Sequence, residues 1–198
     1  MAGNLSTVRA ERDSFGRFFK SWVRNPFAIG AVAPSGRLLA RLMASNLQAG
    51  SRVIELGAGT GTVTRAILDS GVRPEDLFII EQNAEFVEIL RRRFPRCPVL
   101  QADAGALGAY LGQLPDSFDF IISGLPLLLF SRRQKMRILS QAFDVLRPNG
   151  YFHQFTYAGR CPVGRELRAQ LRLESSLIGF TPLNLPPAFV YRFARAAR

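Results

Sequence analysis

The 198-residue sequence has few of the residues that build metal centres, disulfide frameworks or nucleophilic catalytic sites. It contains two cysteines, Cys97 and Cys161, whose spacing matches no metal motif, and a single histidine, His153. We therefore expect both cysteines to be free thiols and the site to hold no metal. No Ser-His-Asp or Cys-His arrangement is evident around the histidine. This scarcity argues against chemistry that depends on a metal ion or on an activated Ser or Cys.

Long hydrophobic runs are also missing. The longest apolar stretch, residues 118–130, is interrupted by Asp119, Ser123, Gly124 and Pro126, so it is too short to span a bilayer. The polar N-terminus lacks the apolar stretch of a signal peptide. The length suits one α/β domain with a sizeable core, and no segment has the composition of a linker. These features predict a cytoplasmic protein.

Lysine is nearly absent, because 24 of the 26 basic residues are arginine, and the formal net charge is +11. Residues 1–50 carry seven basic and two acidic side chains, and residues 151–198 carry the same numbers. Residues 51–100 instead balance seven against seven. The excess positive charge at the two ends favours an anionic partner, either a membrane or a nucleic acid. A compositional bias toward arginine is the simpler alternative.

The most informative segment is Val53–Gly61, in which a β-branched run leads into a turn with Gly57, Gly59 and Gly61. After a helix-length gap, a second apolar run ends in Glu81. Glycines allow a ligand to approach the backbone, and an acid after the second strand can accept the hydroxyls of a ribose. However, the Gly-x-Gly-x-Gly spacing differs from the Gly-x-Gly-x-x-Gly of dinucleotide sites. The segment therefore predicts a nucleoside cofactor of another kind.

An acidic residue, Glu55, lies inside the first of these strands. A carboxylate there would repel a pyrophosphate, but it suits a ligand with an ammonium or sulfonium group. Together with the glycine spacing, this acid resembles motif I of class I S-adenosylmethionine-dependent methyltransferases. The resemblance implies S-adenosyl-L-methionine as cofactor and S-adenosyl-L-homocysteine as product.

Helical and extended patterns alternate along the chain, which predicts an α/β fold with a Rossmann-like, doubly wound sheet. We expect seven strands, mostly parallel, with a C-terminal antiparallel hairpin. The predicted helices cover residues 6–24, 36–47, 61–70, 83–93, 131–146 and 163–173, and the predicted strands cover 52–56, 77–81, 98–101, 118–122, 150–157, 175–180 and 188–194. Residues 1–48 are expected to form an amphipathic helix and a lid segment, and residues 49–198 the methyltransferase domain.

Four of the predicted strands end in residues suited to a ligand, which in open α/β sheets lies beyond the carboxyl ends of the strands. Asp103 follows the third strand and could accept the exocyclic amine of an adenine. A bare tight turn with surface acids is the alternative. The residues expected to bind the cofactor are Glu55, Gly57, Ala58, Gly59, Gly61, Thr62, Glu81, Gln82, Asp103, Ala104, Ser123 and Gly124.

The motif after the fourth strand, Ser123-Gly124-Leu125-Pro126-Leu127-Leu128, discriminates between methyl acceptors. Enzymes that methylate the exocyclic amine of adenine usually carry Asn/Asp-Pro-Pro-Tyr or Asn-Leu-Pro-Tyr there, with an amide or acid for the amine and a ring for the base. Here leucine replaces the ring and the amide is missing, which disfavours base methylation and favours an apolar approach to the methyl donor.

Tyr157, at the carboxyl end of the fifth strand, is the residue best placed for the acceptor, although packing alone would also explain it. His153 alternates with Phe152 and Phe155 along that strand, which favours a structural role over a catalytic one.

The N-terminal segment has an apolar stripe at helical spacing flanked by cations. An aromatic, basic, amphipathic helix is typical of the interface of an anionic membrane. A helix that packs on its own domain through the same stripe is the alternative. The residues expected to contact the membrane are Phe15, Phe18, Phe19, Trp22, Arg17, Lys20 and Arg24.

Together these motifs resemble the bacterial phospholipid N-methyltransferases of the PmtA type. The resemblance covers nearly the whole chain, including residues 30–35, 53–61, 123–128 and 154–157. It implies stepwise methylation of phosphatidylethanolamine, through the monomethyl and dimethyl forms, to phosphatidylcholine by a peripheral enzyme on the inner face of the cytoplasmic membrane. In the catalytic site it implies that Ser123 and Leu125 border the transferable methyl and that Tyr157 meets the lipid headgroup.

The segment Ala33-Pro34-Ser35 is also similar to the corresponding part of ribosomal RNA adenine dimethylases. Methylation of adenine N6 in ribosomal RNA is therefore the alternative function, with nucleic acid the less favoured partner. A nucleoside-binding or lipid-binding module that has lost catalysis is a further alternative, against which the intact glycines, Glu55 and Glu81 argue.

Overall fold

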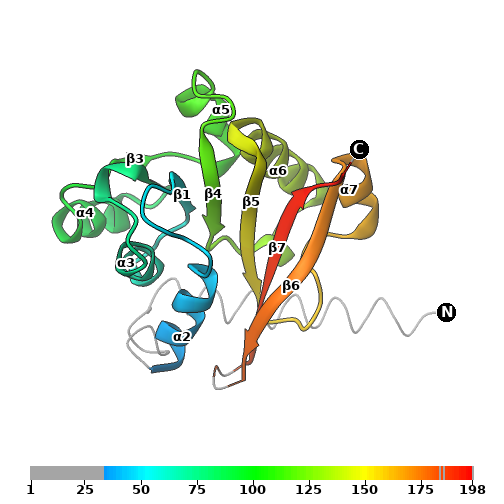
Figure 1. Ribbon diagram of the computed structural model, residues 1–198, viewed down its shortest axis with the longest axis horizontal. Helices are drawn as coiled ribbons and strands as arrows, with labels where there is room; N and C mark the ends of the chain where they lie inside the picture. Colours follow the sequence, from blue (N-terminus) through cyan, green and yellow to red (C-terminus); the bar gives the residue numbers. More distant parts are fainter. Residues whose placement is uncertain (1–33, 183, 185, 198) are drawn as a thin grey trace.

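The computed structural model describes residues 34–182, 184 and 186–197. Within them lies one seven-stranded sheet with the strand order β3-β2-β1-β4-β5-β7-β6. The strands are β1 (Val53–Leu56), β2 (Leu77–Glu81), β3 (Val99–Gln101), β4 (Phe118–Ser123), β5 (Leu146–Thr156), β6 (Leu173–Thr181) and β7 (Ala188–Arg195). β1 to β5 pair in parallel, and β7 is antiparallel to both β5 and β6 (Figure 1). The predicted Rossmann-like sheet with a C-terminal antiparallel hairpin is thereby confirmed.

The α-helices are α2 (Pro34–Met43), α3 (Thr62–Asp69), α4 (Ala84–Arg93), α5 (Leu107–Leu111), α6 (Arg132–Val145) and α7 (Arg165–Gln170). Three 3-10 turns accompany them: η1 (Pro74–Asp76), η2 (Ala104–Ala106) and η3 (Leu127–Leu129). α5 and the 3-10 turns were not predicted, and α7 is shorter than the predicted helix over 163–173. The helix predicted over 6–24 lies outside the described residues.

Local sequence explains where two of these helices begin. The Asn83 side chain accepts from the backbone N–H groups of Glu85 and Phe86 and so caps α4. Ser131 and Gln134 form a reciprocal capping box at the start of α6. Sequence was less reliable at the other end of α6, because β5 follows it directly at Leu146, whereas the strand was predicted to begin at residue 150.

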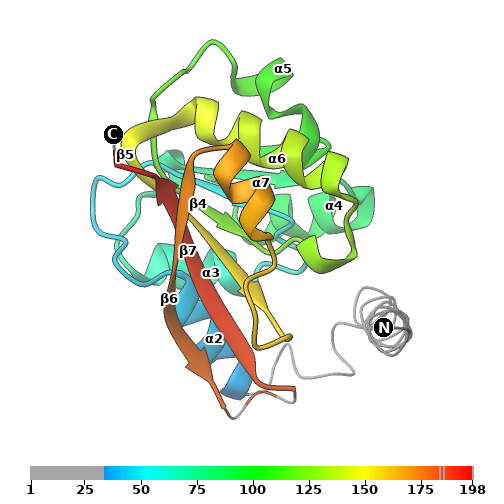
Figure 2. The same cartoon turned by 90° about the vertical axis from the view of Figure 1, so that its right-hand side faces the viewer.

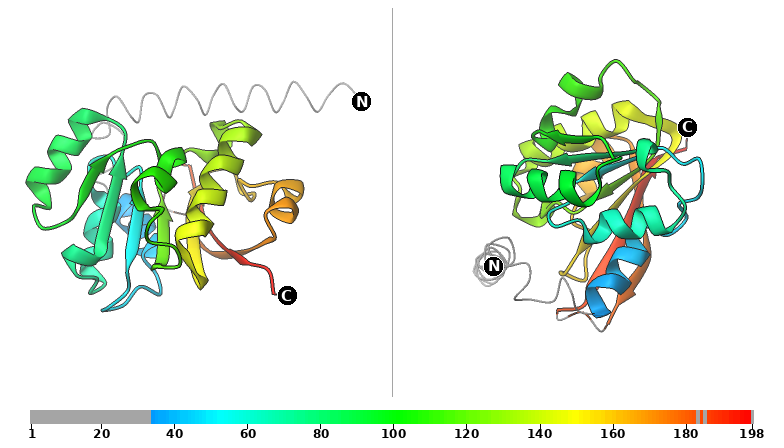
Figure 3. Two further views of the ribbon diagram at one scale, coloured as in Figure 1. Left: turned by 90° about the horizontal axis from the view of Figure 1, so that it is seen from above. Right: turned by 90° about the vertical axis from the view of Figure 1, so that its left-hand side faces the viewer.

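Helices cover both faces of the sheet (Figures 1 and 3). Side chains from α2, α3 and α4 build the core on one face, and side chains from α5, α6 and α7 build the core on the other. β5 contributes side chains to both cores. Phe152 packs in the core on the α6 side, while His153 lies on the opposite face, where its ring contacts Phe120. This alternation suits a strand that is buried on both faces.

α2 is part of this core. Leu39, Ala40 and Met43 are buried, and the helix packs against α3 and β6 (Figure 2). Residues 39–47 therefore contribute to a core shared with the sheet, while the predicted domain boundary at residue 48 remains a prediction. None of the helices within the described residues is both long and apolar enough to cross a membrane.

Candidate active site

The glycine turn between β1 and α3 adopts a backbone conformation that favours glycine. Gly57, Gly59 and Gly61 have φ values of +70°, +55° and +86°. The backbone N–H of Gly57 donates to the carbonyl oxygen of Ile80 at 2.8 Å, which holds the turn beside the end of β2. A side chain at these φ angles is strained, so the spacing of the glycines follows from the shape of the turn.

Glu81, at the carboxyl end of β2, is bound to this turn. Its Oε2 accepts from the backbone N–H of Gly59 at 3.0 Å, and its Oε1 accepts from that of Asn83 at 2.8 Å. The side chain is buried, so these two bonds fix its orientation. Each carboxylate oxygen can accept a further hydrogen bond. The two hydroxyl groups of a ribose diol need such acceptors.

Glu55 has a different environment. It is fully buried in β1, and its Oε2 accepts from the hydroxyl of Thr64 in α3 at 2.6 Å. Its Oε1 has no hydrogen-bond partner among the described residues. Burial raises the pKa of this carboxyl to about 8, and the nearby charge of Glu81 contributes to the same shift. An acid with an unused acceptor atom fits a cationic ligand, since a positive charge would favour its ionised form.

Asp103 follows β3 and caps the η2 turn. Its Oδ1 accepts from the backbone N–H of Gly105 at 2.7 Å, while its Oδ2 accepts from the Arg137 guanidinium of α6 at 2.8 Å. The Asp103 side chain is 47% exposed, so its oxygens remain accessible to an amine. Arg137 was not predicted, because nothing in the local sequence indicates a partner 34 residues away.

The end of β4 contacts the glycine turn directly. The backbone N–H of Gly124 donates to the carbonyl oxygen of Leu56 at 2.8 Å. A Cβ atom at position 124 would lie 2.6 Å from the carbonyl oxygen of Gly57, so only glycine fits there. Ser123 is fully buried, and its hydroxyl accepts from the backbone N–H of Leu125 at 3.3 Å.

The remaining residues predicted to bind the cofactor also follow these strands. Ala58 lies in the glycine turn and Thr62 is the first residue of α3. Gln82 is exposed immediately after β2, and Ala104 is buried at the start of η2. The structure thus brings the predicted residues to the carboxyl ends of β1, β2, β3 and β4, where ligands of open α/β sheets lie.

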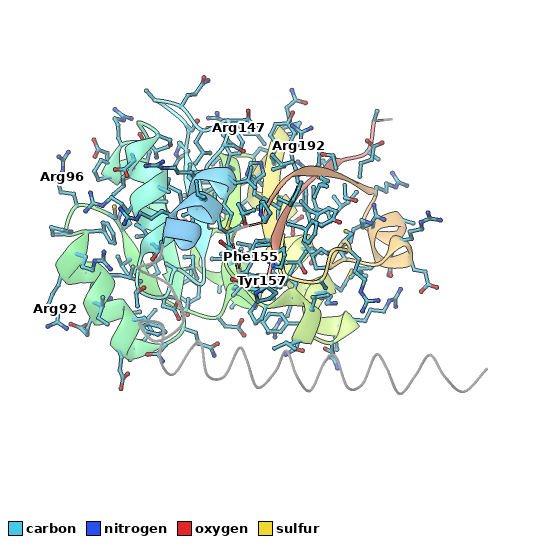
Figure 4. All side chains as sticks on the ribbon, turned by 90° about the horizontal axis from the view of Figure 1, so that it is seen from below. Arg92, Arg96, Arg147, Phe155, Tyr157 and Arg192 are labelled. Carbon is cyan, nitrogen blue, oxygen red and sulfur yellow. The ribbon has the colours of Figure 1, made fainter. Side chains whose placement is uncertain are left out.

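Tyr157 follows β5 on the face that carries α2 and packs edge-on against Phe155, with ring centroids 5.3 Å apart. Figure 4 shows these two side chains together near the middle of the molecule, far from Arg92 and Arg96. Burial raises the pKa of the Tyr157 phenol above its ordinary value of 10. The phenol is therefore neutral near pH 7, and it can form hydrogen bonds but cannot act as a resident base.

His153 has a structural environment. Its Nδ1 lies 2.9 Å from the carbonyl oxygen of Met43 at the end of α2, so Nδ1 carries the proton and donates it. Burial lowers the pKa of this imidazole to about 4. A neutral histidine that ties α2 to β5 agrees with the structural role favoured by the sequence.

Gln154 was not predicted as a site residue. It is fully buried in β5, pairs in register with Ser123, and donates from its side-chain amide to the carbonyl oxygen of Leu125 at 2.8 Å. Its position between His153 and Phe155 gave no signal beyond strand periodicity. The predicted membrane-contacting residues, Phe15, Phe18, Phe19, Trp22, Arg17, Lys20 and Arg24, lie outside the described residues.

Comparison with known proteins identifies relatives. A family model described as a methyltransferase domain matches residues 53–150. An ornithine lipid N-methyltransferase from Singulisphaera acidiphila is 32% identical over 190 residues, which cover 92% of this chain and 94% of that protein.

Solved structures share the fold. A TehB-like SAM-dependent methyltransferase from Corynebacterium glutamicum superposes with a TM-score of 0.62 at 16% identity, covering 94% of this chain and 99% of that one. Phosphoethanolamine N-methyltransferase 1 from Haemonchus contortus, in complex with phosphoethanolamine and S-adenosylhomocysteine, superposes with a TM-score of 0.63 at 16% identity. That match covers 96% of this chain and 50% of the other.

Proposed function

Since the chain belongs to the class I S-adenosylmethionine-dependent methyltransferases, we propose that it methylates the primary amine of an aminolipid at a membrane surface. S-adenosyl-L-methionine is the methyl donor and S-adenosyl-L-homocysteine the product. The observation that carries the proposal is the 32% identity, over nearly the full length, to a protein named for methylating a lipid amine. Phosphatidylethanolamine and ornithine lipid are the two candidate acceptors, and both present a primary amine on a lipid.

The proposed donor site uses the ends of β1, β2 and β3. Glu81 would accept the ribose hydroxyls and Asp103 the adenine amine, while Glu55 would stabilise the positive charge of the donor. The bound donor supplies an electrophilic methyl group. The protein's task is then to align the acceptor amine with this group and to exclude water.

The segment after β4 supports a lipid acceptor. Leu125, Pro126 and Leu127 follow Gly124 without an acid, an amide or an aromatic ring for a nucleobase. Leu127 is buried in the core, whereas Leu125 lies against the glycine turn. This apolar border favours an acceptor that approaches along a hydrocarbon surface over a base that needs stacking and hydrogen bonds.

The acceptor amine must lose a proton before it reacts, because its pKa is about 10 by analogy with lysine. Tyr157 stays neutral and cannot take this proton as a resident base. Its hydroxyl can instead bind the amine or the headgroup, while the proton leaves to water. The enzyme therefore acts by selecting the neutral amine, and its rate should rise with pH below about 10.

Two apolar side chains near this end of the sheet support contact with a membrane. Leu177 and Phe180 of β6 are 50% and 56% exposed. Phe180 stacks on Phe189, which pairs with Thr156 at the carboxyl end of β5. An apolar surface beside the proposed acceptor site is suited to a lipid layer.

The proposal is tested by incubating the full chain and labelled S-adenosyl-L-methionine with three acceptors in parallel. These are anionic vesicles containing phosphatidylethanolamine, the same vesicles containing ornithine lipid, and unmodified ribosomal RNA. We expect label in one or both lipids and none in RNA. Label in RNA alone would overturn the proposal in favour of the adenine N6-methyltransferase alternative.

Membrane contact is tested separately by sedimentation with vesicles. Binding should require anionic lipid and weaken as salt is added. The double variant Phe18→Ser with Trp22→Ser should strongly reduce binding to vesicles. The double variant Leu177→Ser with Phe180→Ser tests in the same way whether β6 contributes to that binding. If neither pair changes sedimentation, the protein does not contact the membrane through these surfaces.

A further inference from the structure

Gln154 is a fully buried polar side chain that the proposed chemistry does not use. It lies near the carboxyl end of β5 and pairs in register with Ser123, the last residue of β4. Its side chain is therefore next to the segment Gly124–Leu127, which borders the proposed site of methyl transfer. A buried amide at such a position needs a structural or functional reason, because its desolvation is unfavourable unless it is hydrogen-bonded.

The amide of Gln154 joins two backbone carbonyls. Its Nε2 donates to the carbonyl oxygen of Leu125 at 2.8 Å and to that of Phe155 at 2.8 Å. Only an NH2 group can donate to two carbonyls, so the orientation of the amide is fixed by these partners. The bond to Leu125 spans 29 residues and ties the segment after β4 to β5.

Leu125 is held at several points. Its carbonyl oxygen accepts from the Gln154 amide and from the backbone N–H of Leu127 at 2.9 Å. Its backbone N–H donates to the Ser123 hydroxyl at 3.3 Å, and its side chain lies over Gly57. The Leu125 Cδ2 atom would be 2.9 Å from a Cβ atom built on Gly57. Gln154 and Ser123 are the two polar side chains that bond to the backbone of Leu125, and Gln154 is the one that ties it to β5.

The remaining polar atom of Gln154 is unused. Its Oε1 is buried and has no hydrogen-bond partner among the described residues. If the side chain served packing alone, an apolar residue of the same length would avoid this unpaired acceptor. The two hydrogen bonds that the amide donates explain why a glutamine stands here. One of them, to Leu125, reaches a residue outside β5.

We propose that Gln154 is a positioning residue for methyl transfer: by fixing the carbonyl oxygen of Leu125, it holds the Leu125 side chain over the glycine turn where donor and acceptor meet. The identity of the acceptor in this role rests on the proposed function, whereas the position of Leu125 is independent of it. Gln154 acts through Leu125 and touches neither substrate. Its loss should therefore reduce the rate of transfer without weakening the binding of the donor.

Gln154→Met removes both donors at nearly constant length, and Gln154→Asn keeps the amide but makes it too short to reach Leu125. Thr156→Val is the matched control, because Thr156 is buried two residues further along the same face of β5 and its hydroxyl accepts from the backbone N–H of the nearby Ala158. We expect both Gln154 variants to lose about tenfold or more in kcat on aminolipid vesicles, with the KM for the donor within about twofold. Thr156→Val should stay within about twofold in both constants.

A second measurement does not need an acceptor. In the protein saturated with S-adenosyl-L-homocysteine, the 13C-methyl resonances of Leu125 are identified by their absence in Leu125→Ile. They should move in Gln154→Met and in Gln154→Asn but not in Thr156→Val, while calorimetry gives unchanged affinity for S-adenosyl-L-homocysteine. If one Gln154 variant fails to fold, the other answers the question.

Unmoved Leu125 resonances, or wild-type kcat in a folded Gln154 variant, would overturn the role of Gln154. A loss of donor affinity as large as the loss of kcat would also overturn it, since the effect would then be general. If the wild-type protein methylates no aminolipid, the proposed function fails, and the Leu125 resonances alone decide the role of Gln154.

Discussion

The two halves of the candidate site are built differently. At β1 and at the ends of β2 and β3 lie three acidic side chains assigned to the proposed donor site, and each is already held by a hydrogen bond from the protein. At the ends of β4 and β5, the described residues around the proposed acceptor site are a leucine, a buried amide and a phenol whose pKa is raised. The donor half is thus acidic and prearranged, and the acceptor half carries no side chain that is charged near neutral pH among Ser123, Leu125, Gln154 and Tyr157.

This contrast separates affinity from rate. A cationic donor gains binding energy from acidic groups whose positions are already fixed, and its positive charge favours the ionised form of Glu55. A neutral amine gains little from charge, so the acceptor half can contribute mainly through position and through exclusion of water. Substitutions in the donor half should therefore change donor affinity, and substitutions in the acceptor half should change turnover.

The largest effect is expected for Glu81→Gln. Its side-chain amide would present an NH2 group to the backbone N–H of Gly59 or of Asn83, so one of these donors loses its partner. We expect donor affinity to fall about tenfold or more, measured by calorimetry with S-adenosyl-L-homocysteine. Glu85→Gln, the same change at an exposed position of α4, is the control and should bind nearly as the wild type does. Equal affinities for wild type and Glu81→Gln would remove Glu81 from the donor site.

A smaller, pH-dependent effect is expected for Glu55→Gln. The folded-state pKa of about 8 lies above the ordinary value of 4.5, so the folded protein binds this proton more tightly than the unfolded chain does. The stability from the protonated form is complete below about pH 4.5 and is lost as pH rises through 8. The variant stays neutral and can still accept from Thr64, so its melting temperature should exceed that of the wild type by a margin that grows between about pH 5 and pH 8.

Thermal unfolding of both proteins across this range checks the prediction, with the exposed Glu85→Gln as control. The same Glu55→Gln variant should bind S-adenosyl-L-methionine more weakly, because it cannot offer a negative charge. If the difference in melting temperature between Glu55→Gln and the wild type stays the same at all pH values, Glu55 is not a buried acid with a raised pKa.

The smallest effect is expected for Tyr157→Phe. Since burial keeps the phenol neutral, its loss removes one hydrogen bond and no base. Turnover on aminolipid vesicles should fall less than about tenfold, and its rise with pH should keep the wild-type shape. Phe155→Leu, which changes the neighbouring ring and leaves the Tyr157 hydroxyl in place, is the matched control. A loss of the pH dependence in Tyr157→Phe would make Tyr157 the proton acceptor after all.

The difference between the halves also explains how much the sequence could predict. The glycine turn, Glu55 and Glu81 lie in one βαβ unit, where local spacing determines geometry. The alternating patterns were sufficient to predict seven strands, mostly parallel, with a C-terminal antiparallel hairpin. The acceptor half depends on contacts between distant segments. The bond from Gln154 to Leu125 spans 29 residues and that from Arg137 to Asp103 spans 34, and no local pattern encodes them.

Short elements were missed for a related reason. α5 has five residues and η3 has three, which is too short for helical periodicity to emerge. β5 begins directly after α6 at Leu146, and its register with β4 shifts between Phe118 and Phe120. The predicted strand began after Pro148-Asn149-Gly150, since these residues are typical of turns.

The separation of affinity from rate is tested most directly by single-turnover transfer to aminolipid vesicles as the donor concentration is raised. Glu81→Gln should approach the wild-type rate once the donor saturates it, because its defect lies in binding. Gln154→Met should stay about tenfold or more below the wild type at every donor concentration, because its defect lies in the position of Leu125. A Glu81→Gln rate that stays low at saturation, or a Gln154→Met rate that recovers, would contradict the account.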